Sequence, residues 1–127
     1  MKPEFYRNFE MSLNKLNQFV AQGIKDELDR AGLIQGFEFV FEQAWKAIQK
    51  KGTEDSVAIN SPKQAFSWAI ELRWIERQDE ALWIQILNDR NQTTHTYKED
   101  LAKSVADHVA RLYAPAFASL LEKMKST

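Results

Sequence analysis

Apolar side chains recur every three or four residues over most of this 127-residue chain. That spacing places them on one face of an α-helix, so the pattern predicts a helical protein. Glycine and proline are scarce, which favours long helices over a sheet of short strands. We therefore predict an all-α fold, an antiparallel up-and-down four-helix bundle with one additional short helix, formed by a single domain of residues 1–127.

The first two predicted helices are long and lie next to each other in the sequence. The first is expected over residues 3–29, with Arg30-Ala31-Gly32 as the break after it. The second is expected over residues 33–51 and should stop at Gly52, because glycine is common just past a helix C-terminus. It carries apolar side chains on two sides, so it needs two partners, one of which we expect to be a second copy of the chain.

The remaining helices follow a predicted loop over residues 52–60. Ser61 and Pro62 should open the third helix, as its N-cap and its first helical residue. A short helix then leads into a polar stretch at residues 89–97. The last helix follows this stretch and should kink near Pro115, because a proline cannot donate a backbone hydrogen bond.

Composition and net charge argue against several classes of function but do not identify one. Hydrophobic residues make up 44% of the chain, enough for a core, and 17 basic residues against 18 acidic ones give a net charge of -1. Bulk charge thus argues against an obligatory polyanion partner, while a local basic patch stays open. The absence of cysteine excludes disulfides, thiolate nucleophiles and cysteine zinc sites. Without an apolar signal segment or a run of ~20 apolar residues, we expect a cytoplasmic protein with no membrane contact.

The polar stretch Asp89-Arg90-Asn91-Gln92-Thr93-Thr94-His95-Thr96-Tyr97 contains no aliphatic side chain. Arg90 can direct two donors at a phosphate, and His95 can take or return a proton near neutral pH. Together they would suffice for metal-free RNA cleavage. The alternative is an interhelical loop in which Asp89 and Arg90 cap helix ends and His95 hydrogen-bonds the backbone. Spacing alone favours the loop, because an arginine and a histidine five apart recur often by chance.

Other candidates each have a structural alternative. Tyr97 could stack on a base or accept a transferred group, or it could pack the loop onto the bundle. Glu38 and Glu42 share one helix face and could orient a histidine or hold a hard cation, or they could form an exposed stripe with Lys46. His108 is expected to be a partly buried structural residue. With two histidines and no cysteine there is no zinc spacing, and without a Gly-rich phosphate loop we expect no metal and no cofactor.

Four segments favour the functional interpretations over the structural ones. Together and in order, they resemble the nucleotidyltransferase substrate-binding protein family. They are Ile34-Gln35-Gly36-Phe37-Glu38-Phe39-Val40-Phe41-Glu42-Gln43-Ala44-Trp45-Lys46, Ser61-Pro62-Lys63, the polar stretch from Asp89 to Tyr97, and Tyr113-Ala114-Pro115-Ala116-Phe117. That family lies in the HEPN superfamily of small helical bundles. Its members typically dimerise and are encoded beside a minimal nucleotidyltransferase.

The resemblance implies roles for the polar stretch. The Arg-x4-His signature of HEPN ribonucleases maps onto Arg90 and His95, with Asn91 as the polar residue after the arginine. In toxin–antitoxin members the partner transfers AMP from ATP to the tyrosine of Arg-x4-His-x-Tyr, which is Tyr97 here. We therefore expect a homodimeric, metal-independent endoribonuclease toxin silenced by adenylylation of Tyr97. The supporting residues of the site are expected to be Asp89, Thr94, Glu38 and Glu42.

A second interpretation stays open. The chain could be a non-catalytic substrate-binding subunit of a two-component nucleotidyltransferase, with the polar stretch binding a nucleotide or the partner. Arg90 would still matter in that case, but His95 would not act as a base.

Overall fold

The computed structural model describes residues 1–127, and every regular element in it is helical. The α-helices are α1 (Pro3–Gln22), α2 (Glu27–Glu54), α3 (Pro62–Glu71), α4 (Glu80–Gln92), α5 (Glu99–His108) and α6 (Ala114–Lys125). Short 3-10 turns at Arg77–Asp79 and Thr93–His95 flank α4, and a π-helical turn at Val109–Tyr113 joins α5 to α6. The predicted all-α bundle is confirmed. None of the helices is both long and apolar enough to cross a membrane.

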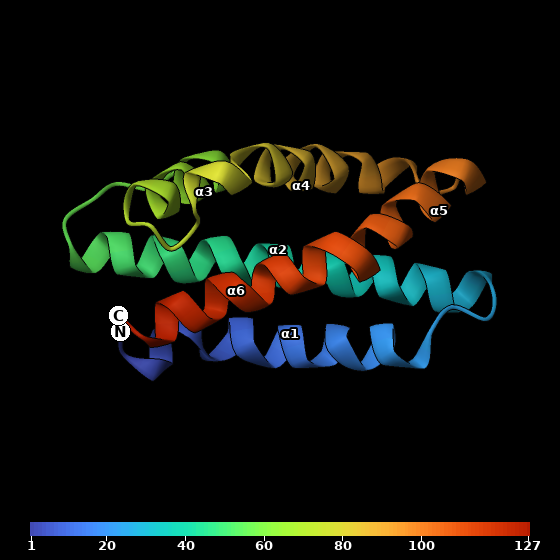
Figure 1. The fold of residues 1–127 in the computed structure, drawn as a ribbon, viewed down its shortest axis with the longest axis horizontal. Helices are drawn as coiled ribbons and strands as arrows, with labels where there is room; N and C mark the ends of the chain where they lie inside the picture. The colour runs from blue at the N-terminus through green and yellow to red at the C-terminus, as the bar shows by residue number, and fades with distance from the viewer.

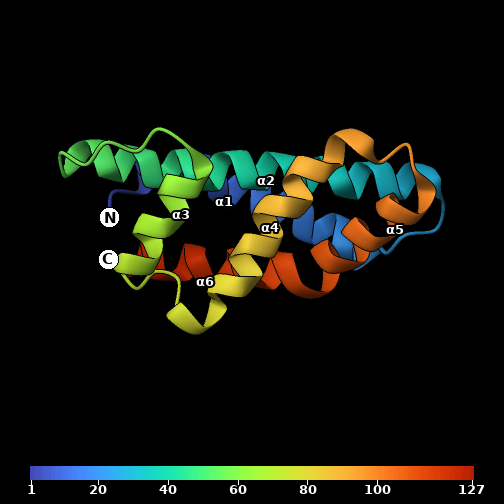
Figure 2. The ribbon, with the colours of Figure 1, turned by 90° about the horizontal axis from the view of Figure 1, so that it is seen from above.

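The helices form three layers. Figure 1 shows α3 and α4 on one side, α2 and α6 in the middle, and α1 on the opposite side. Seen from above, α3 and α4 lie obliquely across the long axis of the bundle (Figure 2). The two chain ends lie side by side, and the amino group of Met1 contacts the backbone oxygen of Thr127. The end of α4 that carries the polar stretch thus lies far from the termini, near the start of α5.

The first interhelical turn lies earlier than the sequence pattern predicts. Gly23 ends α1 in a left-handed conformation with φ of 77°. Asp26 caps the start of α2 by accepting a 2.9 Å hydrogen bond from the backbone N–H of Asp29. The predicted break at Arg30-Ala31-Gly32 is wrong, since these residues are helical in α2. Leu28 continues the apolar spacing of α1 but is 79% exposed, so this local cap outweighs the periodicity.

The predicted end of α2 is also wrong, because Gly52 lies inside the helix and not beyond it. Its carbonyl oxygen accepts a 2.7 Å hydrogen bond from the N–H of Val57, which turns the chain back. A Cβ at this position would lie 2.8 Å from Cγ1 of Ile59, so only glycine lets the returning loop approach this closely. The start of α3 matches the prediction: the Ser61 hydroxyl accepts a 3.1 Å hydrogen bond from the N–H of Gln64.

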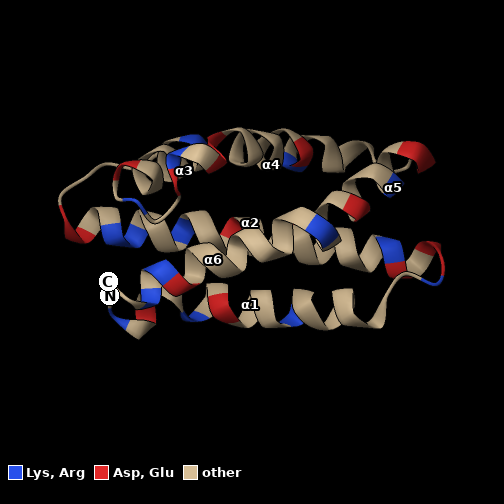
Figure 3. Cartoon of the chain, in the orientation of Figure 1, with Lys and Arg blue, Asp and Glu red and all other residues tan.

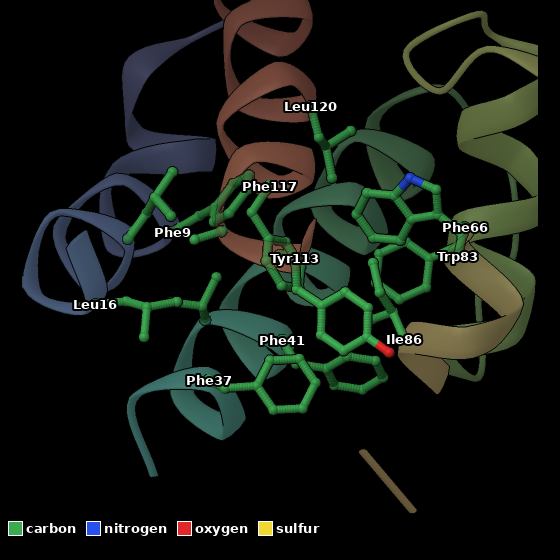
Figure 4. Close-up of a cluster of buried hydrophobic side chains, with 14 of the residues drawn as sticks. Phe9, Leu16, Phe37, Phe41, Phe66, Trp83, Ile86, Tyr113, Phe117 and Leu120 are labelled. Carbon is green, nitrogen blue, oxygen red and sulfur yellow. The ribbon is translucent and has the colours of Figure 1, made fainter. Parts of the chain in front are cut away.

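A cluster of buried aromatic rings anchors α4 to three other helices (Figure 4). Trp83 of α4 lies 4.8 Å from Phe66 of α3 and 5.3 Å from Phe117 of α6, measured between ring centroids. Phe66 in turn lies 5.5 Å from Phe41 of α2. Burial of each such side chain contributes about 1.5–3 kcal/mol, so these contacts fix the position of α4 and of the polar stretch at its end.

The last helix is distorted close to Pro115, where the sequence predicts a kink. Proline lacks a backbone N–H, and its ring crowds the carbonyl of residue 111 one turn earlier. The π-helical turn Val109–Tyr113 widens the helix at this place, and the ribbon bends between α5 and α6 in Figure 1. The widened turn faces α4, and its Tyr113 contacts Asp89 at the end of that helix.

Candidate functional site

The polar stretch is mostly helical, so the prediction of an interhelical loop is correct only for its last residues. Asp89 to Gln92 form the last turn of α4, and Thr93 to His95 continue as a 3-10 turn. Consecutive helical residues point roughly 100° apart. Asp89 and Arg90 therefore face different neighbours, although they are adjacent in sequence.

Arg90 is held against α2 by two polar side chains. Its Nη1 donates a 2.9 Å hydrogen bond to the hydroxyl of Thr93 and lies 3.4 Å from Oε2 of Glu38. The Thr93 hydroxyl lies 3.1 Å from the same Glu38 oxygen, and Thr93 is buried. The guanidinium also lies 6.0 Å from the ring centroid of Phe41, within reach of a cation–π contact. These contacts fix the Arg90 side chain. Because 30% of it is exposed, it is also accessible to a ligand.

The structure separates the two glutamates that the sequence placed together. Glu38 reaches the polar stretch, where it contacts Arg90 but no histidine. Glu42 accepts a 3.0 Å hydrogen bond from the indole N–H of Trp45 and lies 3.3 Å from the ammonium of Lys46. Glu42 is thus engaged by the surface pair foreseen as its structural alternative. No group of three or more His, Cys, Asp or Glu side chains is arranged to hold a metal ion.

The second half of the stretch is open to solvent. Asn91, Thr94 and His95 are exposed, and Tyr97 is 78% exposed. The rings of His95 and Tyr97 meet edge to face with their centroids 6.2 Å apart. Tyr97 therefore does not pack the turn onto the bundle, and both rings are available to a large ligand or to a modifying enzyme.

Asp89 points the other way, toward the π-helical turn. Its Oδ2 accepts a 2.6 Å hydrogen bond from the hydroxyl of Tyr113 and lies 2.7 Å from Nδ1 of His108. Burial, and then the hydrogen bond to Asp89, raise the pKa of Tyr113 well above its ordinary range. Asp89 is thus a partly buried connection between helices, not a helix cap. No pattern in the sequence pointed to this contact, since His108 and Tyr113 are five apart in the predicted last helix, a spacing that points two side chains away from each other wherever the helix is regular.

Charge is mixed along the helices (Figure 3) and beside the polar stretch. Basic and acidic residues are interspersed along α1, α2 and α6 in Figure 3. Beside the polar stretch, a cavity of about 150 Å³ is bordered by Thr96 with Glu27, Arg30 and Glu99. A phosphate-bearing ligand would therefore be attracted by individual cations such as Arg90, and not by a broad basic surface.

Comparisons with known proteins agree with this architecture. A family model described as nucleotidyltransferase substrate binding protein like matches residues 4–126. A crystal structure of a protein from Thermus thermophilus superimposes with a TM-score of 0.84 at 28% sequence identity, covering 92% of this chain and 98% of that one. A search of curated proteins found no match. The family match includes the whole polar stretch and all but the first residue of the six α-helices.

Proposed function

This chain belongs to the nucleotidyltransferase substrate-binding protein-like family, and from that premise we propose that it is the HEPN toxin of a two-component toxin–antitoxin system. Its activity would be metal-independent RNA cleavage, and its partner a minimal nucleotidyltransferase. The observation that carries this proposal is that a fixed, partly exposed Arg90 in the last turn of α4 is followed five residues later by an exposed His95 in the adjoining 3-10 turn.

The proposed reaction uses the ribose 2′-hydroxyl as nucleophile. His95 removes its proton, the 2′-oxygen bonds to phosphorus, and the bond from phosphorus to the 5′-oxygen breaks. The leaving 5′-oxygen takes a proton from solvent water, and His95 later returns its own proton to solvent, which gives a 2′,3′-cyclic phosphate and a 5′-hydroxyl. Arg90 stabilises the charge that builds on the phosphorane-like transition state, and Asn91 and Thr94 position the RNA.

The surroundings of Arg90 suit a phosphate ligand. Only Nη1 of the guanidinium has a partner within the chain, so Nε and Nη2 keep donors for an incoming oxygen. Glu38 and Thr93 hold the side chain in one orientation, which lowers the entropic cost of binding. A preorganised cation is worth most for charge that develops during the reaction.

Tyr97 is proposed as the off-switch. Its phenolic oxygen would attack the α-phosphorus of ATP, pyrophosphate would leave, and the phenolic proton would pass to solvent. The 78% exposure of Tyr97 supports access by a second enzyme. The attached AMP would bring negative charge and bulk beside His95, and would repel and occlude RNA.

A homodimer is part of the proposal. In α2, Val40 is buried in the core, whereas Phe39 on the other side is 58% exposed and borders a groove of about 580 Å³ between α1 and α2. A second copy would cover this apolar surface. Phe39→Asp should shift the molar mass measured by light scattering from dimer to monomer. Leu28→Asp, which changes another exposed apolar residue of α2, should not. A dimeric Phe39→Asp protein would place the interface elsewhere.

A non-catalytic substrate-binding subunit is the second candidate, and the substrate-binding description of the matching family favours it. One experiment separates the two. The purified protein and its His95→Ala variant are each incubated with total RNA in EDTA. If the protein is a ribonuclease, the wild type should cleave the RNA and the His95→Ala variant should not. Intact RNA with both proteins, or equal cleavage by both, would contradict the ribonuclease and leave the binding subunit.

A further inference from the structure

The π-helical turn Val109–Tyr113 brings together two residues that a regular helix would keep apart. Residues five apart in an α-helix point roughly 140° away from each other, since each residue turns the helix by about 100°. A π turn widens the helix so that such residues face more nearly the same way. His108 and Tyr113 thereby reach a single oxygen, Oδ2 of Asp89, at 2.7 Å and 2.6 Å.

The chemistry of this contact is well defined. An ionised carboxylate can only accept hydrogen bonds. With Asp89 as a carboxylate, Nδ1–H of His108 therefore donates a hydrogen bond to it, as the Tyr113 hydroxyl does. Such charge-assisted bonds are shorter and stronger than neutral ones. Only 16% of the Asp89 side chain is exposed, which limits competition by water. The last turn of α4 is therefore tied to the last residue of α5 and to the last residue of the π turn.

Arg90 follows Asp89 directly, points to a different neighbour and is held there by Glu38 of α2. The last turn of α4 therefore has two sets of contacts. Asp89 bonds to α5 and the π turn, and Arg90 contacts α2. We infer that Asp89, His108 and Tyr113 are positioning residues that set the orientation in which Arg90 meets a phosphate. The kinetic part of this inference rests on the proposed ribonuclease activity, and the structural part does not.

Core packing alone does not account for the polar groups of this cluster. The Tyr113 ring packs 5.5 Å from the ring of Phe37, centroid to centroid, and a phenylalanine would keep that contact. A partly buried carboxylate with two donors is no more stabilising than well-packed apolar side chains of similar volume. What the polar groups add is direction, because hydrogen bonds fix the angle and distance between α4 and the π turn.

Tyr113→Phe and Asp89→Asn test the inference through kinetics. Both should lower kcat for RNA cleavage on the order of tenfold to a hundredfold with little change in KM, because a displaced Arg90 fails in the transition state more than in binding. Asp107→Asn is the matched control. Asp107 precedes His108 but pairs only with Arg111 of the same stretch of chain. Wild-type kcat in both test variants would overturn the inference, and if Asp89→Asn does not fold, Tyr113→Phe decides.

A second readout follows Arg90 itself and needs no activity. In 15N-labelled protein, the guanidinium signal of Arg90, assigned by its loss in Arg90→Lys, should shift and exchange faster with solvent in Tyr113→Phe and Asp89→Asn. The signal should stay unchanged in Asp107→Asn. An unchanged signal in all variants would overturn the inference even if kcat fell. If the wild type cleaves no RNA, the proposed function fails, while this measurement still tests the positioning role.

Discussion

The two halves of the polar stretch differ in burial and in their contacts with the rest of the fold. Asp89, Arg90 and Thr93 are partly or fully buried and bonded to α2 or to the π turn. Thr94, His95 and Tyr97 are exposed, and the rings of His95 and Tyr97 meet edge to face. The first half fixes the cation of Arg90, and the second half exposes the proposed base, His95, and the proposed AMP acceptor, Tyr97. The proposed function needs both properties, because RNA and a modifying enzyme would both have to reach the site.

The largest effect is expected for the exposed half, at the proposed acceptor of AMP. Tyr97→Phe removes the only atom of this side chain that could attack ATP and should abolish labelling by the cognate nucleotidyltransferase. Mass spectrometry after incubation with ATP measures this. Tyr6→Phe is the control and should be labelled like the wild type. Labelling that survives Tyr97→Phe would assign the modification to another residue.

In the fixed half, Arg90→Ala should lower kcat/KM for RNA cleavage on the order of a hundredfold to a thousandfold, as expected when a preorganised donor to a developing charge is lost. Arg90→Lys should recover only part of the activity, because a lysine cannot reproduce the planar fork of donors. Initial rates on one defined RNA give both values. Full activity of the lysine variant would show that charge alone suffices.

The pH dependence of unfolding tests the buried contact of Tyr113. Its folded-state pKa is raised by burial and by Asp89, so the unfolded chain releases this proton first as pH rises. The contact contributes fully below about pH 10 and is lost above it, at no more than about 1.4 kcal/mol per pH unit. Urea unfolding at pH 8 and pH 11 should show a smaller loss for Tyr113→Phe than for the wild type. Equal losses would contradict the assigned contact.

The smallest effects come from two neighbouring threonines, one in each half. Thr93→Ala removes a buried hydroxyl that joins Arg90 to Glu38 and should lower the free energy of unfolding by roughly 1–3 kcal/mol. Thr94→Ala changes an exposed side chain and should cost less than about 0.5 kcal/mol. Chemical denaturation measures both. Similar values for the two variants would erase the distinction between the halves.

How far the sequence predicts this molecule depends on the range of the interaction. The helical bundle and the Ser61 cap follow from periodicity and from residues within one turn. The turn at Gly23 is not foreseeable from the pattern, because the apolar spacing continues through the exposed Leu28. Glu38 beside Arg90 is a sequence-based candidate, but helix geometry alone cannot tell it from Glu42, since both share a face of α2.

The Asp89 cluster shows where prediction fails for a physical reason. A regular helix separates His108 from Tyr113, so their meeting at Asp89 depends on the π turn. That turn depends in part on Pro115, whose effect on the preceding carbonyl is foreseeable but whose outcome, a kink or a widened turn, is not. Long-range contacts between α4 and the last helix then decide which polar side chains are buried.

The ends of the RNA products test the central claim most directly. Wild-type protein is incubated in EDTA with a defined single-stranded RNA, and the products are examined by mass spectrometry. Attack by the 2′-hydroxyl with His95 as base predicts a 2′,3′-cyclic phosphate on one fragment and a 5′-hydroxyl on the other, and no cleavage where the 2′-hydroxyl is methylated. Intact RNA, or fragments with 3′-hydroxyl and 5′-phosphate ends, would contradict it.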